Sequence, residues 1–304
     1  MRMNVEWIAV DWGTSNLRVW VMNAQGDVID HLTSDQGMGI LTRDGFEPAL
    51  LSLIDGYLST DRITPVICCG MVGARQGWVE APYSAVPCSP AGYDQAVLVG
   101  PTDPRISVYI LPGLSQQSPA DVMRGEETQI AGYLAQSPNF DGVICLPGTH
   151  TKWAHISAAE VVSFKTYMTG EMFSLLCSAS VLRHSVGGDD WDDDAFLAAL
   201  DQIYSRPQSL AGDLFSLRAN DLLSSVNAGQ SRAALSGMLI GMELAAARPY
   251  WLGQAVVLIG APNMVDLYRK ALAHLGAMVL PDTANDVTLH GLQAAYAIYK
   301  DAQT

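Results

Sequence analysis

Positive charge is scarce in this sequence. The chain carries 17 Lys and Arg residues against 31 Asp and Glu residues, which gives a formal net charge of −14. A surface this acidic argues against general binding to nucleic acid or to an anionic membrane. A local nest of backbone amides with a few basic side chains still binds a small anion, so small acidic substrates remain compatible with the sequence.

Long hydrophobic runs and metal-type cysteine spacings are also lacking. No apolar run approaches the ~20 residues that a membrane span needs, and the N-terminal residues do not follow the layout of a signal peptide. The five cysteines are odd in number, and none of their spacings resembles a zinc site. Cys68, Cys69 and Cys145 lie in apolar runs, so we expect reduced, mostly buried thiols. These features predict a soluble cytoplasmic protein.

The sequence does contain enough apolar residues for a substantial core. Hydrophobic residues make up 49% of the 304 positions and charged residues 16%, a composition typical of folded globular proteins. The length suits two domains of ordinary size, or one large domain.

One pattern of elements occurs twice along the chain. A short apolar run ends at Asp11, a polar loop follows, and two β-rich runs joined by residues 23–27 indicate a hairpin before a helical pattern over 46–58. Residues 142–168 repeat the order of buried strand, polar loop and paired strands, and a helical pattern follows again. The recurrence predicts two similar α/β domains that face one another.

The boundary between the two predicted domains falls near Ser137-Pro138-Asn139, which interrupts a helical pattern. We place the first domain over 1–136, with the C-terminal helix 287–304 packed back on it, and the second over 137–286. Further buried strands are predicted at 64–69, 106–111 and 256–259, and a short strand at 277–280. Further helices are predicted at 124–135, 171–182, 192–204, 213–223, 231–247, 264–275 and 287–300.

The first polar loop has the composition of a phosphate-binding turn. Asp11 stands at the carboxyl end of a buried strand, and Gly13, Thr14, Ser15 and Asn16 follow it. Glycine permits a tight turn, and successive amides and hydroxyls can wrap a phosphate tail. Asp11 is the candidate ligand for a hydrated Mg²⁺ that bridges the phosphates. The alternative is an ordinary hairpin turn whose Asp and Thr side chains bond to turn amides.

The second polar loop, residues 147–152, occupies the equivalent position in the repeat. Gly148, Thr149 and Thr151 offer the same phosphate-cradle chemistry. Two such loops in parallel positions are harder to explain as ordinary turns. Gly260 is a weaker third candidate, because it ends a buried strand just before a helix whose N-terminus favours an anion.

A catalytic carboxylate is expected at the start of the helical pattern over 124–135. If the two polar loops hold a phosphate donor, transfer of its phosphoryl group needs a base, or at least an orienting carboxylate, near the attacking hydroxyl. Glu126 and Glu127 both lie in the first turn, and we prefer Glu126 because only one of the two can point into a ligand site. The alternative is that these acids only complement the helix dipole.

A glycine-rich stretch over 70–78 follows a buried strand and supplies the candidate substrate contacts. Ligands bind at the carboxyl ends of strands in open α/β sheets. Arg75 is suited to a forked pair with a substrate carboxylate, and Trp78 to packing on the face of a sugar. Gly37 and Met38, in a similar earlier loop, are assigned to the same pocket. A surface loop with a solvated arginine is the alternative.

The acidic run over 188–194 is interpreted as the start of a helix rather than as a metal site. Acidic residues cap helices and complement the helix dipole, which explains the run without a bound ion.

Three motifs, in order along the chain, resemble one family. Asp-Trp-Gly-Thr-Ser-Asn-Leu-Arg starts at Asp11, Arg-Gly-Glu-Glu-Thr-Gln at Arg124, and Pro-Gly-Thr-His-Thr-Lys-Trp at Pro147. In combination they resemble the 2-dehydro-3-deoxygalactonokinases, kinases of the galactonate branch of sugar-acid breakdown, over nearly the whole chain. The resemblance implies the superfamily of acetate and sugar kinases, heat-shock chaperones and actin, with two ribonuclease H-like domains and an interdomain cleft.

The resemblance also implies where the nucleotide binds. Residues 11–15 would match the first phosphate motif, residues 148–151 the second, and Gly260 the adenosine motif. The helices over 124–135 and 287–300 would match the two interdomain connecting helices. The adenosine region of this chain reads Gly-Ala-Pro, where many sugar kinases have two consecutive glycines.

The implied reaction is phosphorylation of 2-dehydro-3-deoxy-D-galactonate at its C6 hydroxyl by ATP with Mg²⁺. Glu126 falls where relatives place a catalytic acidic or amide residue. It, or Asp11 through a metal-bound water, would orient the hydroxyl, and domain closure would exclude water. Two alternatives stay open, a phosphatase or ATPase of the same fold and a non-catalytic nucleotide switch. The oligomeric state is left undetermined, with a homodimer as one option.

Overall fold

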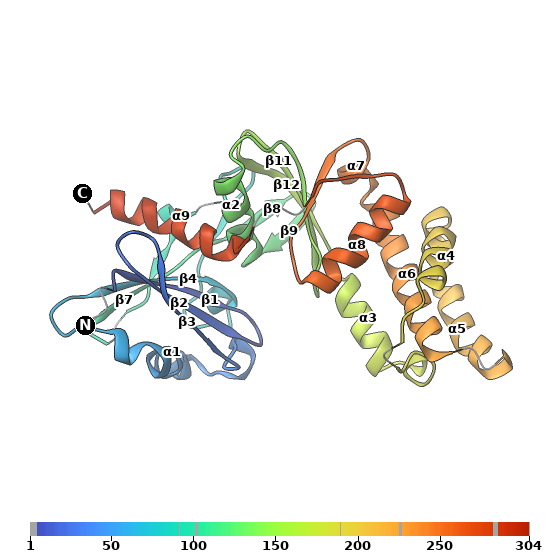
Figure 1. Cartoon of the computed structure of the whole chain (residues 1–304), viewed down its shortest axis with the longest axis horizontal. Coiled ribbons are helices and arrows are strands. Elements are labelled where there is room, and N and C mark those ends of the chain that lie inside the picture. The colour runs from blue at the N-terminus through green and yellow to red at the C-terminus, as the bar shows by residue number, and fades with distance from the viewer. Residues whose placement is uncertain are drawn as a thin grey trace. The chain divides into compact units, whose positions relative to one another are not determined.

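A computed structural model describes residues 5–90, 92–100, 103–188, 190–224, 227–281 and 285–303. The chain divides into two compact units (Figure 1). Unit 1 comprises Met1–Phe140, Ser157–Ser163 and Thr283–Thr304, and unit 2 comprises Asp141–Ile156 and Phe164–Asp282.

The central sheet of unit 1 has the strand order β3-β2-β1-β4-β7-β6. β1 pairs antiparallel with β2 and parallel with β4, and β4 pairs parallel with β7. The Asn23 side-chain oxygen accepts hydrogen bonds from the amides of Gln25 and Asp27, which confirms the predicted hairpin turn. The strands are β1 (Trp7–Trp12), β2 (Leu17–Met22), β3 (Val28–Ser34), β4 (Thr64–Gly70), β6 (Val97–Leu98) and β7 (Ile106–Ile110).

Helices cover both faces of this sheet (Figure 1). Helix α1 (Phe46–Ile54) packs Phe46 and Leu50 onto one face, and α9 (Val287–Asp301) packs Leu292 onto the other. The parallel strands between them are buried on both sides, which explains why their sequences read as continuous apolar runs.

Helix α2 (Glu126–Gln136) contacts α9 backbone to backbone through two glycines. A Cβ on Gly132 would lie 1.7 Å from the carbonyl oxygen of Val287, and a Cβ on Gly291 would lie 1.9 Å from that of Thr128. No side chain fits at either position, so glycine is required for this close approach.

Unit 1 also contains a small sheet that the sequence did not predict. Its order is β5-β8-β9. The polar residues of β8 and β9 are partly exposed, so these strands lack the apolar runs from which the buried strands were predicted. Its strands are β5 (Tyr83–Ala85), β8 (Gly113–Gln117) and β9 (Ala120–Met123).

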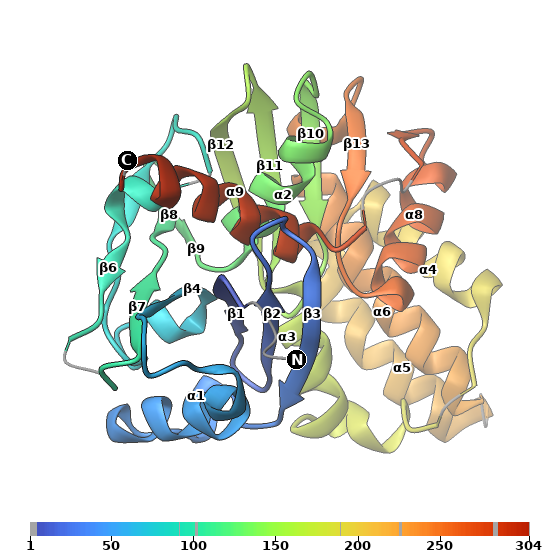
Figure 2. The same ribbon diagram turned by 60° about the vertical axis from the view of Figure 1, so that its left-hand side comes forward.

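The five-stranded sheet, which lies mainly in unit 2, has the order β12-β11-β10-β13-β14. Its strands β12, β11, β10 and β13 are labelled in Figure 2. β10 pairs antiparallel with β11 and parallel with β13, as β1 does with β2 and β4. The predicted recurrence of one α/β pattern is therefore confirmed, and in both units it is ribonuclease H-like. The strands are β10 (Gly142–Leu146), β11 (Thr151–Ser157), β12 (Glu160–Tyr167), β13 (Ala255–Leu258) and β14 (Met278–Val279).

Helices make up the rest of unit 2. Helix α6 packs closely on α4, where a Cβ on Gly237 would lie 2.1 Å from the carbonyl oxygen of Phe196. The Asp192 carboxylate accepts a hydrogen bond from the amide of Ala195 at 2.9 Å. This confirms the capping interpretation of the acidic run, of which Asp189 lies outside the described residues. The helices are α3 (Thr169–Ser178), α4 (Asp193–Ser205), α5 (Leu210–Ser224), α6 (Ala228–Ala246), α7 (Arg248–Trp251) and α8 (Pro262–His274).

The expected burial of the thiols is confirmed for Cys68, Cys69 and Cys145. Loss of solvation raises the pKa of each of these three thiols above its ordinary value, so they are protonated at neutral pH. Across the described ranges, no helix combines the length and the apolar character that a bilayer span requires.

Candidate active site

The turn Gly13–Asn16 joins β1 to β2 and exposes its Thr, Ser and Asn side chains. The Met38 amide donates to the carbonyl of Gly13 at 2.9 Å, and the next amide, of Gly39, donates to that of Thr14 at 2.8 Å. A Cβ on Gly37 would lie 2.3 Å from the backbone carbon of Ser15, so only glycine lets this segment support the turn so closely. The structure thus brings the predicted residues of this loop together with Gly37 and Met38.

Asp11 lies at the carboxyl end of β1, and its two oxygens have different neighbours. Oδ2 accepts hydrogen bonds from the guanidinium of Arg18, 2.9 Å from Nε. Oδ1 lies 3.8 Å from Sγ of Cys69 on β4. Asp11 and the turn Gly13–Asn16 line one cavity of about 900 Å³, together with Arg18, Thr33, Ser34, Asp35 and Leu53.

Glu126 and Glu127 lie in different environments at the start of α2. Glu127 is 2% exposed, and its oxygens accept hydrogen bonds from the Gly125 amide at 2.7 and 2.9 Å. Burial, with a smaller effect from the charge of Glu126, raises the pKa of Glu127 to about 8. Glu126 is partly exposed, and its Oε2 accepts from the Arg124 amide at 3.1 Å. Glu126 is therefore the more accessible carboxylate.

The start of α2 lies beside the carboxyl end of β4. A Cβ on Gly125 would lie 3.4 Å from the Cα of Gly70. Burial raises the pKa of the Cys69 thiol, and the charges of Asp11 and Glu127 raise it further. The carboxylates of Asp11 and the first turn of α2 therefore gather at one edge of the sheet of unit 1.

Arg75 and Trp78 differ in how free they are to meet a ligand. The Arg75 side chain is 81% exposed, with Nε 3.5 Å from a carboxylate oxygen of Glu80. The indole of Trp78 stacks on Phe46 with ring centroids 6.0 Å apart and meets Trp12 edge-on at 6.1 Å. Trp78 is thus largely committed to the core of unit 1, whereas the guanidinium of Arg75 is accessible.

In unit 2 the second predicted loop connects β10 to β11. Thr149 is exposed at its tip, next to the partly exposed Gly148. Thr151 is fully buried, and its hydroxyl lies 3.0 Å from that of Tyr268. A Cβ on Gly260 would lie 3.0 Å from the carbonyl oxygen of Pro147, which places Gly260 against this loop. The loop thus offers Gly148 and Thr149 to a ligand, while the Thr151 hydroxyl is engaged in the core.

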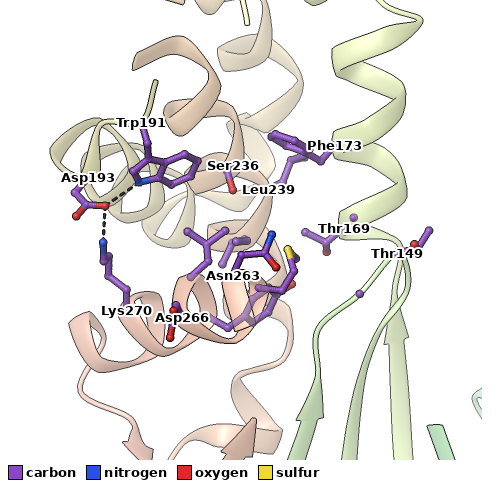
Figure 3. Close-up of a pocket in the computed structure, with 16 residues that line it drawn as sticks. Thr149, Thr169, Phe173, Trp191, Asp193, Ser236, Leu239, Asn263, Asp266 and Lys270 are labelled. Carbon is purple, nitrogen blue, oxygen red and sulfur yellow. Dashed lines mark hydrogen bonds and ion pairs between the residues drawn. The ribbon is translucent and has the colours of Figure 1, made fainter. Parts of the chain in front are cut away.

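A cavity of about 700 Å³ in unit 2 opens beside this loop (Figure 3). Phe173 of α3 and Trp191, which precedes α4, flank it on two sides. The Trp191 indole N–H donates to Asp193 at 2.8 Å, and Asp193 pairs with Lys270 of α8 at 2.5 Å. The remaining lining is Gly148, Thr149, Thr169, Gly170, Ser236, Leu239, Ile240, Asn263, Met264, Asp266, Leu267 and Tyr268.

Sequence reasoning missed most of this cavity. Phe173, Trp191 and the α8 residues Asn263 and Lys270 come from three separate segments and share no local motif. The one available signal was the turn at Gly260, which leads into α8. Aromatic and aliphatic walls with a few polar groups at the edge are typical of small-molecule sites.

Over the part of the chain that the structure describes, no three His, Cys, Asp or Glu side chains converge to hold an ion. Mg²⁺ needs no such cage, because it is usually held by one or two carboxylates together with water and substrate phosphates.

Two ribonuclease H-like units, each with a polar turn after its first strand, define the fold that sugar kinases and actin share. The activator of 2-hydroxyisocaproyl-CoA dehydratase from Clostridium difficile has the same fold, with a TM-score of 0.50 and 12% identity over 98% of this chain and 97% of that one. The predicted fold class is therefore confirmed.

The family model for 2-keto-3-deoxy-galactonokinase matches residues 11–295, and the chain belongs to this family of sugar-acid kinases. The 2-dehydro-3-deoxygalactonokinase of Escherichia coli (strain K12) is 35% identical over 97% of this chain and 100% of its own. A protein of Rhizobium meliloti (strain 1021), named as a probable 2-dehydro-3-deoxygalactonokinase, DgoK1, is 38% identical over 94% of this chain and 95% of its own length. A crystal structure from Sinorhizobium meliloti, assigned to the same activity, has a TM-score of 0.89 and 37% identity. The match covers 96% of this chain and 99% of that one. The resemblance read from the motifs is confirmed.

Proposed function

We propose that this protein transfers the γ-phosphoryl group of ATP to the C6 hydroxyl of 2-dehydro-3-deoxy-D-galactonate, giving the 6-phosphate and ADP. The observation that carries the proposal is the family match over residues 11–295, which includes Asp11, Glu126 and both polar loops. The relatives bear the name of this kinase and match along almost their full length. This favours a kinase over a phosphatase or a nucleotide switch of the same fold. A cytoplasmic location would give the enzyme both substrates.

ATP is assigned to unit 2. The cavity between Phe173 and Trp191 has aromatic and aliphatic walls that suit a purine, and Asn263 adds an amide. Gly148 and Thr149 border the same cavity, and the proposal assigns the phosphates to them. Gly260 supports this loop from the adjacent turn.

Mg²⁺ is assigned to Asp11. Because Arg18 occupies Oδ2, Oδ1 is the oxygen left for an ion or for its bound water. Thr14, Ser15 and Asn16 line the same cavity and supply further oxygen atoms. A single carboxylate with phosphate and water oxygens fits the ligand preference of Mg²⁺. When bound, Mg²⁺ would neutralise charge on the phosphates.

The sugar acid is assigned to unit 1, at the edge of the sheet where Asp11 and the first turn of α2 lie. In this proposal Glu126 accepts a hydrogen bond from the C6 hydroxyl and takes its proton as the oxygen attacks phosphorus. Arg75 is assigned to the substrate carboxylate. Trp78 and Met38 shape the loops around it, and Gly37 holds its segment against the turn.

Acceptor-dependent ADP release tests this function directly. The purified protein would be screened in a coupled assay against a panel of 2-keto-3-deoxy sugar acids that differ in stereochemistry. We expect ADP release with the galactonate-derived acid and little without an acceptor. Equal release without any acceptor would identify a hydrolase, and nucleotide binding with no turnover would identify a switch.

Replacing Trp191 with alanine is expected to raise the KM for ATP by roughly tenfold, since stacking of a base on an aromatic ring contributes about 1–3 kcal/mol. The KM for the sugar acid should not change, because Trp191 lies in unit 2. Trp191→Phe is the matched control and should retain most of the affinity. An unchanged KM for ATP in Trp191→Ala would remove Trp191 from the nucleotide site.

Replacing Arg75 with alanine is expected to raise the KM for the sugar acid by about tenfold, because a charge-assisted pair with a carboxylate would be lost. The KM for ATP should stay constant. Arg62→Ala is the matched control, since Arg62 is another exposed arginine of unit 1 and pairs with Glu6. No rise in the KM for the sugar acid would reject the carboxylate contact.

A further inference from the structure

Glu243 of α6 is a fully buried carboxylate with several hydrogen-bond donors around it. The indole N–H of Trp153 donates to Oε1 at 2.8 Å. The hydroxyl of Tyr268 donates to Oε2 at 2.8 Å, and the hydroxyl of Thr169 donates to the same oxygen. The Thr151 hydroxyl, 3.0 Å from that of Tyr268, completes the cluster. One side chain therefore ties together β11, α3, α6 and α8.

The donors of this cluster hold the parts of unit 2 that border the second loop. Thr151 is the first residue of β11, directly after the loop. Thr169 is the first residue of α3 and, like Tyr268, lines the cavity. The next residue, Gly170, lies so close to the loop that a Cβ there would be 2.2 Å from the carbonyl oxygen of Gly148.

A backbone hydrogen bond strengthens this connection. The amide of Glu171, in the first turn of α3, donates to the carbonyl of Thr149 at 2.9 Å. The position of the loop tip therefore depends on where α3 begins. The hydrogen bond from Thr169 to Glu243 holds the first residue of α3 in place.

Burying a carboxylate is unfavourable in free energy, because the charged group loses its contact with water. Burial raises the pKa of Glu243 to about 7, although the hydrogen bonds from Thr169, Trp153, Tyr268 and Thr151 work in the opposite direction. The other ionisable neighbours are the Cys145 thiol and the Tyr268 hydroxyl, and burial raises the pKa of each above its ordinary value. Apolar packing of similar volume would stabilise a fold at least as well. An apolar residue cannot supply acceptor atoms that hold several donors at once.

We propose that Glu243 is a positioning residue for ATP, which acts by fixing the loop around Gly148 and Thr149 and the Tyr268 wall of the cavity in the geometry that binds the nucleotide. The inference rests on the assignment of ATP to unit 2. Glu243 itself does not touch the nucleotide in this scheme.

Glu243→Gln is the decisive variant, because it keeps the size of the side chain and replaces one acceptor oxygen with a donor. The KM for ATP, and the Kd for ATP from calorimetry, are expected to rise about tenfold, as for supporting groups around other sites. The KM for the sugar acid should stay within about twofold, a split that a loss of folded protein would not produce. Equal Kd values for the variant and the wild type, with thermal unfolding unchanged, would overturn the proposal.

Hydrogen exchange of the ligand-free protein gives a second readout that does not depend on turnover. Peptides that cover residues 147–151 and 169–171 should exchange about tenfold faster in Glu243→Gln, because about 1.4 kcal/mol of local stability is lost. Glu127→Gln makes the same chemical change at a buried carboxylate of unit 1 and should leave these peptides unaffected. Unchanged exchange at the loop in Glu243→Gln would refute the positioning role, whatever the activity.

Two further outcomes keep the inference separate from the proposed function. If the wild-type protein fails to bind ATP, the assignment of the nucleotide is wrong, and hydrogen exchange alone decides whether Glu243 fixes the loop. If Glu243→Gln does not fold, Thr169→Val removes one donor only and should raise the Kd for ATP by a smaller factor, about threefold. No rise in that variant would count against the proposal.

Discussion

Replacing Glu126 with glutamine should lower kcat by roughly 10²- to 10⁴-fold, the range expected for loss of a general base. The KM values for ATP and the sugar acid should change only a few-fold, because glutamine keeps the size of the side chain and one acceptor oxygen. The reason is chemical, since the amide cannot take the proton of the C6 hydroxyl as the phosphoryl group moves. Steady-state kinetics with saturating ATP would measure the effect.

Glu127→Gln is the matched control for this variant. The two residues are adjacent, but Glu127 is 2% exposed and burial raises its pKa to about 8. At pH 7 it is therefore mostly neutral already, so an amide changes its charge little. We expect kcat within about tenfold of the wild-type value. If Glu127→Gln is the inactive variant and Glu126→Gln the active one, the assignment of the base must be exchanged.

Replacing Asp11 with asparagine should lower kcat by roughly 10²- to 10³-fold, the loss typical of one group that stabilises charge in a transition state. Asparagine fits the same space and can still accept a hydrogen bond from Arg18. It removes the negative charge through which Mg²⁺ would be held, so the variant should also need more Mg²⁺ for half-maximal activity. A titration of activity against Mg²⁺ concentration measures both effects.

Asp35→Asn is the matched control for Asp11→Asn. Asp35 lines the same cavity of unit 1 but does not lie at the end of β1. The same loss of one charge there should leave both the rate and the Mg²⁺ requirement close to those of the wild type. A wild-type rate in Asp11→Asn would rule out the role given to Asp11.

Elements with a strong local pattern were predictable from the sequence. The strand Gly142–Leu146 is buried along its whole length and carries a continuous apolar run, so the prediction and the structure agree. The turn at Asn23 has a side chain that bonds to its own backbone amides, which is a local property. The strands Gly113–Gln117 and Ala120–Met123 have neither feature, and only their pairing with each other and with β5 defines them.

The candidate site was predictable only where its residues are close in sequence. Asp11 and the turn Gly13–Asn16 are contiguous and line one cavity. The walls of the cavity in unit 2 come from Phe173, Trp191 and Lys270, which the fold alone brings together. Thr151 shows that a contiguous motif can also mislead. Its place in the second loop indicated a phosphate contact, but its hydroxyl lies against that of Tyr268 in the core. No pattern in a sequence reports which way a threonine points.

The glycine contact between α2 and α9 has a practical consequence for work on the protein. The backbones touch at Gly132 and Gly291, and α2 begins with Glu126. The last helix of the chain therefore braces the element that presents the candidate base, although the two are more than 150 positions apart in sequence. Truncations that enter α9, or fusions that strain it, would disturb phosphoryl transfer while leaving every residue of the candidate site in place.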